Sequence, residues 1–258
     1  MLGTMTTAAT LEPIPHSAIV TGAAGGIGYA TARRLLQEGD SVLLADLDQK
    51  RLDDAASRLA ADAGADPKRI ATIVCDVSRE DQVAAAADAA IARFGHWDIL
   101  VNNAGLMSFK PIEEQTVEDW QRILGVDLLG AFLFIKQAFL KMQGGGAVVN
   151  VSSVHAIRTE PLVAPYAAAK TALLSLTRSA ALEGKPKGIR VNAVLPGAVD
   201  TPMLWDNPNV RSGAETINKA DIGSPDDIAA AIAFLAGPAA AFICGDAIRV
   251  DGGRLVRL

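Results

Sequence analysis

The sequence predicts an α/β fold, in which a doubly wound parallel sheet of seven strands carries helices on both faces. Short β-branched or aliphatic segments, typical of buried strands, occur seven times along the chain. Hydrophobic residues make up 50% of the chain and aromatic residues 5%, which suits a core of small aliphatic side chains between helices and strands. The expected strands are Ser17–Thr21, Ser41–Asp46, Ile70–Cys75, Ile99–Asn102, Ala147–Val151, Arg190–Leu195 and Ala247–Val250.

Helical segments separate these strands. They are rich in Ala and Leu, and their apolar residues recur three and four positions apart, as on one face of a helix. When strand and helix alternate, each connection must cross back over the sheet, so the strands run parallel and helices cover both faces. The expected helices are Gly26–Glu38, Asp48–Ala63, Glu80–Phe94, Val117–Met142, Val163–Glu183 and Pro225–Leu235.

The chain is expected to form one domain. Its 258 residues would suffice for one large α/β domain or two small ones, but no change of composition marks a linker. We expect a flexible N-terminal tail over residues 1–16 and a single domain over residues 17–258. Within that domain, residues 202–224 become polar and irregular, which predicts a long loop.

Charge and cysteine content argue against binding of nucleic acid, membrane or zinc. The formal net charge is −5, and no block of like charge or run of 18 apolar residues indicates contact with nucleic acid or a membrane. Cys75 and Cys244 are too few for a disulfide framework and lack zinc-site spacing. His16 and His96 have no partner at metal-ligand spacing and are expected at the surface. We therefore expect a cytoplasmic protein that binds no metal and acts on a small molecule.

A glycine-rich turn follows the first strand. The sequence Thr21-Gly22-Ala23-Ala24-Gly25-Gly26-Ile27-Gly28 leads into a helix. Gly22 permits the tight turn, Gly26 lets the backbone approach a pyrophosphate, and Gly28 lets helix and strand pack closely. The helix N-terminus would offer free N–H groups to the phosphates. The turn predicts a dinucleotide site, while the same spacing also occurs in βα turns that bind no ligand.

An acidic residue ends the second strand. Asp46 lies about twenty residues beyond the glycines, where a carboxylate binds the ribose hydroxyls of adenosine and repels a 2′-phosphate. Positions 23, 24 and 47 hold no Arg or Lys that would bind such a phosphate. The pattern favours NAD over NADP, although an Asp at a strand end is also a common turn residue.

Four motifs together resemble the short-chain dehydrogenase/reductase family, over about Ser17 to Gly253. They are the glycine-rich turn, the run Asn102-Asn103-Ala104-Gly105, the spacing Tyr166-x-x-x-Lys170, and Pro196-Gly197 with Thr201. The resemblance implies a Rossmann-type fold and a dinucleotide-binding catalytic domain. It also implies an oxidoreductase that exchanges hydride between NAD and a secondary alcohol or ketone.

The resemblance assigns the reaction centre to Ser153, Tyr166 and Lys170. Tyr166 and Lys170 are one helical turn apart, so their side chains project from the same face. A free tyrosine titrates near pH ~10, but the lysine cation and an oxidised nicotinamide would lower the pKa of Tyr166 toward neutrality. Tyr166 would then exchange the proton on the substrate oxygen. Ser153 would hold that oxygen, and Lys170 would also bind the nicotinamide ribose.

The resemblance also implies the cofactor contacts. Gly22, Gly26, Ile27 and Gly28 would form the phosphate cradle, with Asp46, Tyr166 and Lys170 on the two riboses. Asp76 and Val77 would meet the adenine, Asn103 the adenosine side, and Val199 and Thr201 the carboxamide. For the two valines, core packing is the alternative interpretation.

The chain departs from the family pattern at Asp127. The family usually has asparagine there, whose backbone carbonyl holds a water linked through the lysine to the proton relay. Either Asp127 replaces the amide as an isostere, or its carboxylate alters the electrostatics of Lys170 and shares protons with the relay. Asp127 therefore joins the candidate catalytic residues.

The sequence leaves the substrate and the direction of reaction open. His155 faces the substrate or is a polar loop residue, and the segment around it is weakly similar to glucose 1-dehydrogenases of the family, which suggests a sugar or polyol. An NADPH-dependent 3-oxoacyl carrier-protein reductase is an alternative that Asp46 disfavours. A non-catalytic dinucleotide-binding sensor is another.

A homotetramer is expected. The family's usual tetramer packs long helices and C-terminal segments against one another. The segments Val117–Met142, Val163–Glu183 and Phe242–Leu258 are apolar enough for this, unless their apolar faces belong entirely to the core of one chain.

Overall fold

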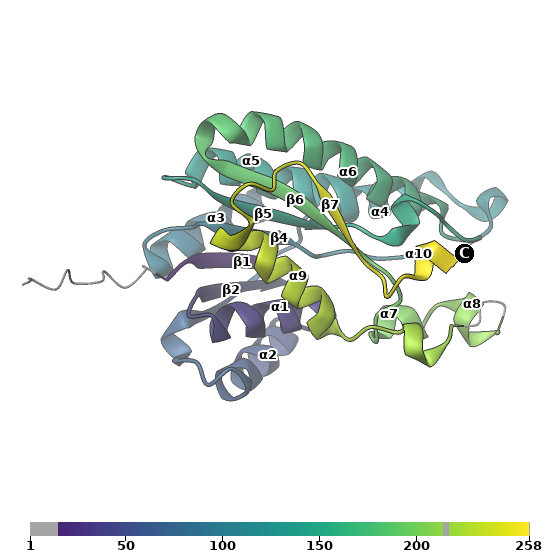
Figure 1. Ribbon diagram of the computed structural model, residues 1–258, viewed down its shortest axis with the longest axis horizontal. Helices are drawn as coiled ribbons and strands as arrows, with labels where there is room; N and C mark the ends of the chain where they lie inside the picture. Colours follow the sequence, from purple (N-terminus) through teal and green to yellow (C-terminus); the bar gives the residue numbers. More distant parts are fainter. Residues whose placement is uncertain (1–14, 214–216, 258) are drawn as a thin grey trace, which may run out of the picture.

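A single parallel sheet of seven strands organises the computed structural model, which describes residues 15–213 and 217–257 (Figure 1). The strands lie in the order β3-β2-β1-β4-β5-β6-β7, and every neighbouring pair is parallel. Their bounds are β1 Ser17–Thr21, β2 Ser41–Asp46, β3 Ile70–Val74, β4 Ile99–Asn102, β5 Gly146–Val151, β6 Ile189–Pro196 and β7 Ala247–Val250. The predicted fold class is confirmed.

The chain changes direction across the sheet between β1 and β4. It moves outward from β1 to β3, then returns to β4 on the other side of β1 and continues outward to β7. In open parallel sheets, ligands bind beyond the carboxyl ends of the strands at such a switch point. The strand order therefore predicts a ligand site beyond the carboxyl ends of β1 and β4.

Two layers of helices cover the sheet (Figure 1). Within β1, Ala18 and Val20 pack toward α1, α2 and α9, whereas Ile19 packs toward α3, α5 and α6. This alternation buries both faces of the strands, as expected for their uninterrupted apolar sequence. The helices are α1 Gly26–Gln37, α2 Gln49–Asp62, α3 Glu80–Phe94, α4 Val117–Leu124, α5 Ala131–Lys141, α6 Ala164–Gly184 and α9 Pro225–Ala236.

The helix expected over Val117–Met142 is interrupted. A π-helical turn, η3 (Gly125–Gly130), separates α4 from α5. A Cβ at Gly130 would lie 2.7 Å from a methyl carbon of Val77, so the turn packs closely on the segment after β3. Asp127 lies within this turn and its side chain is buried. Single π turns inside α-helices often occur at functional sites.

The run Val117–Lys141 is long and apolar enough to cross a membrane by length and composition, with a mean hydropathy of 1.8 in its most apolar window. In the fold, Ile123, Phe134 and Ile135 of this run are buried against other parts of the chain. Their packing with α3, α6 and the sheet accounts for the apolar character of the run.

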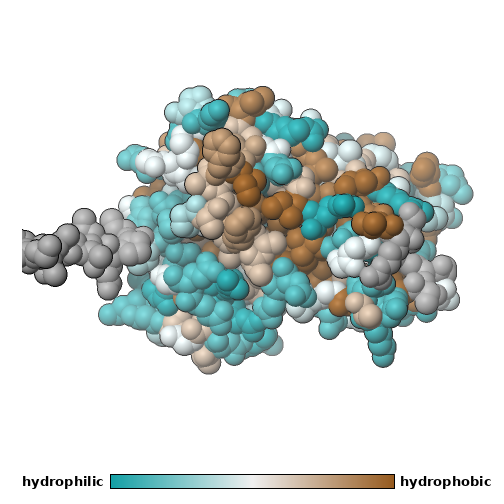
Figure 2. Space-filling model, viewed as in Figure 1, coloured by the Kyte–Doolittle hydropathy of each residue, from teal (hydrophilic) through white to brown (hydrophobic). Residues whose placement is uncertain are grey.

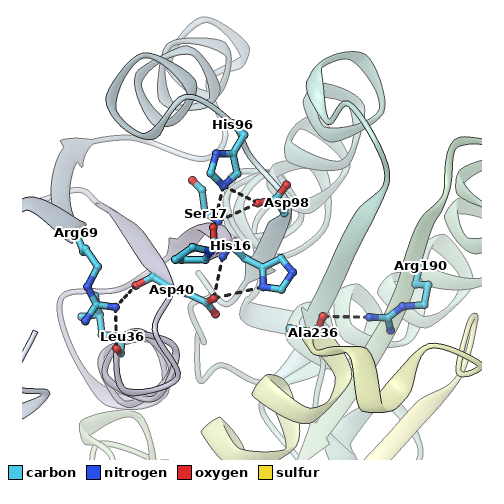
Figure 3. A network of polar contacts seen from close by, with 10 residues as sticks. His16, Ser17, Leu36, Asp40, Arg69, His96, Asp98, Arg190 and Ala236 are labelled. Carbon is cyan, nitrogen blue, oxygen red and sulfur yellow. Dashed lines mark hydrogen bonds and ion pairs between the residues drawn. The ribbon is translucent and has the colours of Figure 1, made fainter. Parts of the chain in front are cut away.

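Polar contacts fasten the N-terminal end of β1 (Figure 3). Asp40 accepts a hydrogen bond from the backbone N–H of His16 at 3.1 Å and lies 3.4 Å from its Nδ1. Asp98 accepts one from the N–H of Ser17 at 2.9 Å and lies 3.2 Å from Nε2 of His96. Residues 1–14 of the expected N-terminal tail lie outside the described residues.

The polar segment expected near residues 202–224 contains short helices. They are α7 Pro202–Trp205, α8 Pro208–Arg211 and η6 Lys219–Asp221, and residues 214–216 lie outside the described part. Together with the C-terminal α10 (Arg254–Arg257), α7 and α8 lie beyond the carboxyl edge of the sheet (Figure 1). The remaining single turns are η1 Pro67–Arg69, η2 Ile112–Glu114, η4 Val154–Ala156, η5 Lys185–Lys187 and η7 Pro238–Ala240.

Candidate active site

A cavity of about 500 Å³ opens at the carboxyl edge of the sheet, beyond the switch between β1 and β4. Most of the residues predicted from the sequence line it. They are Gly22, Gly26, Ile27, Asp46, Asp76, Val77, Asn103, Ser153, Tyr166, Lys170, Val199 and Thr201. Gly28 and Asp127 do not line this cavity: Gly28 lies against the turn itself, and Asp127 borders a smaller space behind Lys170.

The glycine-rich turn forms a tight cradle at one end of the cavity. Gly22 has a φ of +62°, and a Cβ at Gly28 would lie 2.2 Å from the carbonyl oxygen of Gly22. The amide of Asn103 donates to that oxygen and to the oxygen of Thr21, so it also holds the turn. Within the part of the chain that the structure describes, no side chain caps the N-terminus of α1 at Gly25. The cradle therefore fits a pyrophosphate bound by backbone N–H groups.

Asp46 and Arg51 stand beside this turn. The carboxylate of Asp46 accepts hydrogen bonds from the backbone N–H of Ala24 at 3.0 Å and of Leu47 at 2.8 Å. Arg51 belongs to the first turn of α2 and lines the same cavity. Its Nη2 atom would lie 3.3 Å from a Cβ built on Gly25. Arg51 lies outside positions 23, 24 and 47, where the sequence pattern leads one to expect a cation, because it follows the strand by a helical turn.

A buried chain of hydrogen bonds fixes α6 against the sheet. Asn102 of β4 donates to Asn150 of β5 at 2.9 Å, Asn150 donates to the hydroxyl of Thr177 at 2.9 Å, and Thr177 donates to the backbone of α6. The hydroxyl of Ser152 also donates to the carbonyl of Lys170 at 2.9 Å. These contacts fix the position of α6 along the strands and therefore the positions of Tyr166 and Lys170.

Tyr166, Lys170 and Ser153 converge at the floor of the cavity. The ammonium of Lys170 lies 5.6 Å from the centre of the Tyr166 ring and donates to the carbonyl of Val151 at 3.0 Å. Ser153 follows β5, and its Oγ accepts a hydrogen bond from the N–H of His155 at 3.1 Å. All three predicted residues are buried, with 4–6% of their surface exposed. A hydroxyl and a phenol thus lie where both can contact one substrate oxygen, and the ammonium lies beside the phenol.

Asp127 forms an ion pair with Lys170. Its Oδ2 lies 3.2 Å from the Lys170 ammonium, and its Oδ1 accepts a hydrogen bond from the N–H of Leu106 at 3.0 Å. Burial raises the pKa of Asp127, against the attraction of Lys170 and the Leu106 bond. A space of about 10 Å³, enough for one water, borders Asp127, Lys170 and Thr21. The side chain that departs from the family pattern therefore contacts Lys170 directly.

Burial dominates the electrostatics of Tyr166. It raises the pKa of the phenol, and the negative charge of Asp127 raises that pKa further. Lys170 and the hydrogen bond with Ser153 act in the opposite direction but do not outweigh burial. The lowered pKa expected from the sequence is therefore not produced by Lys170 alone.

The far wall of the cavity holds His155, for which the sequence left a substrate-facing or a loop position open, and three polar groups outside the motifs. The ring of His155 packs edge-on against Tyr166, with centroids 5.8 Å apart, which places His155 beside the reaction centre. Glu160, Asn207 and Arg254 line the same cavity. They come from the η4–α6 loop, the α7–α8 loop and the short helix α10, whose sequences carry no recognisable spacing.

Comparison with known proteins supports this arrangement. The family model described as enoyl-(acyl carrier protein) reductase matches residues 22–254. Cis-4-hydroxycyclohexanecarboxylate dehydrogenase of Sinomonas cyclohexanicum is 44% identical over 92% of this chain and 95% of its own. The chain belongs to the short-chain dehydrogenase/reductase family.

Two further relatives extend the comparison. 3beta-hydroxysteroid dehydrogenase 1 of Eggerthella lenta is 39% identical over 91% of this chain and 92% of its own. The crystal structure of levodione reductase superposes with a TM-score of 0.87 at 35% identity, covering 94% of this chain and 98% of the other. As a member of the family, the chain is an oxidoreductase that transfers hydride between a nicotinamide cofactor and an alcohol or ketone.

Proposed function

We propose that this short-chain dehydrogenase/reductase uses NAD(H) and acts on a secondary alcohol or ketone carried by a saturated ring. The convergence of Ser153, Tyr166 and the Lys170 ammonium at the floor of one cavity carries the proposal. The ring is supported by the names of two relatives, which give a hydroxycyclohexane and a hydroxysteroid as substrates. Sugars and polyols, suggested by the sequence, are the second class to test.

The side chains of the floor would divide the chemistry. When bound, the cofactor takes hydride from the carbinol carbon or returns it to the carbonyl carbon. Ser153 and Tyr166 hold the substrate oxygen, and the phenolate of Tyr166 takes its proton in oxidation and returns it in reduction. Lys170 stabilises that phenolate through its charge. Asp127 holds the Lys170 ammonium in place through their ion pair.

The cofactor would occupy the rest of the cavity. Gly22, Gly26, Ile27 and Gly28 shape the pyrophosphate cradle, and Asp46 stands where the adenosine ribose binds. Asp76, Val77 and Asn103 would line the adenosine side, and Val199 with Thr201 the nicotinamide side. Asp46 supports NAD, while Arg51 beside it is the feature that favours NADP.

We further propose a cytoplasmic homotetramer. Phe132 and Leu140 of α5 are 44% and 68% exposed, and Phe242 before β7 is fully exposed. Figure 2 shows apolar side chains gathered over the middle of one face, where Figure 1 places β7 and α9, with hydrophilic ones over α1 and α2. Exposed apolar side chains of this size favour contact with other subunits.

The first prediction tests the reaction. Tyr166→Phe should lower NAD+ reduction by about 100-fold or more, because the proton acceptor is lost. The assay uses ring alcohols, polyols, open-chain secondary alcohols and hydroxy acids, and NADH binding, followed by fluorescence, should stay unchanged. Tyr29→Phe is the matched control, since its hydroxyl contacts Asp62 between α1 and α2. Full activity in Tyr166→Phe, or NADH binding by wild type without any turnover, would contradict the proposal and favour a sensor.

The second prediction concerns the cofactor. The double variant Asp46→Ala, Leu47→Arg should shift kcat/KM from NAD toward NADP by about tenfold or more, because it removes one repulsion and adds a charged hydrogen bond. Arg51→Ala in the wild-type background measures how far Arg51 already helps NADP. An unchanged ratio in the double variant would place the ribose elsewhere. A wild type that prefers NADP would mean that Arg51 outweighs Asp46.

The third prediction concerns Asp127. The variant Asp127→Asn should keep comparable activity and shift the pH profile of alcohol oxidation to lower pH. Its reason is electrostatic: the Asp127 charge raises the pKa of Tyr166, so its removal lowers that pKa and the phenolate forms at lower pH. The measurement is kcat/KM from neutral to alkaline pH. A profile identical to wild type would indicate an isostere. Near-complete inactivity with intact NADH binding would show that the carboxylate is essential.

The fourth prediction concerns assembly. Light scattering on the purified protein at micromolar concentration should give the mass of a tetramer. Replacing the exposed Leu140 with Asp should reduce that mass, because a charge would be buried in the contact. A monomeric wild type would refute the tetramer and would assign these apolar faces to single-chain packing.

A further inference from the structure

The single turn η4, which follows β5, holds His155 beside the reaction centre. The N–H of His155 donates to the Oγ of Ser153 at 3.1 Å, and the N–H of Ala156 donates to the carbonyl of Ser153 at 3.0 Å. The hydroxyl of Thr171 in α6 donates to the carbonyl of Ala156 at 3.2 Å. The backbone of His155 is therefore fixed on Ser153 at one side and on α6 at the other.

The side chain of His155 has one nitrogen without a protein partner. His155 lines the active-site cavity, and its ring packs edge-on against Tyr166 with the centroids 5.8 Å apart. Its Nδ1 lies 3.5 Å from the hydroxyl of Thr159. Within the described part of the chain, no residue forms a hydrogen bond with its Nε2. This nitrogen is thus left for a ligand in the cavity.

The imidazole of His155 is uncharged at neutral pH. Burial lowers the pKa of His155, while the charge of Glu160 raises that pKa and the charge of Arg254 lowers it. A neutral imidazole has one donor and one acceptor nitrogen, and the tautomer decides which is which. A hydroxyl group both donates and accepts, so it fits Nε2 in either tautomer. A ketone or carboxylate oxygen fits only the tautomer with its proton on Nε2.

The rest of this end of the cavity suits a hydrocarbon ring between two polar anchoring points. One point is the pair Ser153 and Tyr166, and the other is His155. Of the other polar groups here, Glu160 accepts a hydrogen bond from the amide of Asn207 at 2.8 Å. Apolar side chains would cover the ring. They are Leu106, Met107, Val154, Met203 and Leu204.

We propose that His155 binds a second hydroxyl of the substrate, so that the enzyme selects ring diols over ring alcohols with a single oxygen. The inference rests on the proposed function, since it assumes that the reacting hydroxyl of the same molecule contacts Ser153 and Tyr166. Two hydroxyls held at once fix the orientation of the ring and therefore the carbon that loses hydride. A substrate without the second hydroxyl would leave Nε2 covered and without a partner, which costs binding free energy.

The test compares ring alcohols that differ in one hydroxyl. Wild type should oxidise at least one cyclohexanediol isomer with a kcat/KM about tenfold or more above that for cyclohexanol. His155→Phe keeps a ring against Tyr166 but has no nitrogen, and it should reduce that ratio about fivefold or more. His155→Gln should restore part of the ratio, because its amide also donates and accepts. His96→Phe, before β4 and outside the cavity lining, is the matched control and should keep the wild-type ratio.

A binding measurement separates this inference from the proposed function. Alcohols cannot be oxidised in the enzyme–NADH complex, so titrating that complex with them, followed by NADH fluorescence, measures recognition alone. At least one diol should bind wild type about tenfold more tightly than cyclohexanol, and His155→Phe should remove that difference. Equal affinities or no binding in wild type, or a difference that survives in His155→Phe, would overturn the inference. If the difference depends on His155 but no alcohol is oxidised, the proposed function fails and the role of His155 stands.

Discussion

The reaction centre depends on the buried hydrogen bonds that join β4, β5 and α6. An aliphatic core holds a helix on a sheet but sets its position along the sheet only loosely, because dispersion contacts have no preferred direction. The chain from Asn102 through Asn150 to Thr177 supplies that direction, and each buried side chain in it has a partner. A shift of α6 would break the bond from Asn150 to Thr177 and the bond from Ser152 to the Lys170 carbonyl, and would leave buried polar groups unpaired. Tyr166 and Lys170 are therefore held by a network that lies beneath them.

The π turn completes this arrangement from the opposite side. It turns Asp127 inward, so that its carboxylate lies 3.2 Å from the Lys170 ammonium, and both side chains are buried. Removing one member of a buried pair is far more destabilising than removing both, because the remaining charge loses its partner. The pair therefore makes the positions of α4–α5 and α6 interdependent. The ion pair between Asp127 and Lys170, which acts on the pKa of Tyr166, thus also connects the π turn to α6.

The elements predicted from the sequence are those whose signal is local. Buried parallel strands are continuous apolar runs, and the glycine turn shows the backbone constraint directly, since a Cβ at Gly28 would meet the Gly22 carbonyl. The π turn could not be predicted, because one extra residue in a helical turn hardly changes an apolar pattern. Arg51 and Arg254 were missed for another reason. Arg51 lies in the first turn of α2 and Arg254 in the C-terminal α10, outside the motifs, so only the three-dimensional packing shows that both line the cavity.

Each end of the cavity is lined by a carboxylate and a guanidinium. At the cofactor end, the Asp46 carboxylate stands near the Arg51 guanidinium, and at the substrate end Glu160 and Arg254 share the wall. Each end therefore presents both signs of charge, and its preference for a neutral or an anionic ligand follows from which group the ligand contacts. Asp46 is fastened by two backbone N–H groups and Glu160 by the amide of Asn207. The two carboxylates are thus held in place by hydrogen bonds within the fold, and a bound ligand would meet each of them in that fixed position.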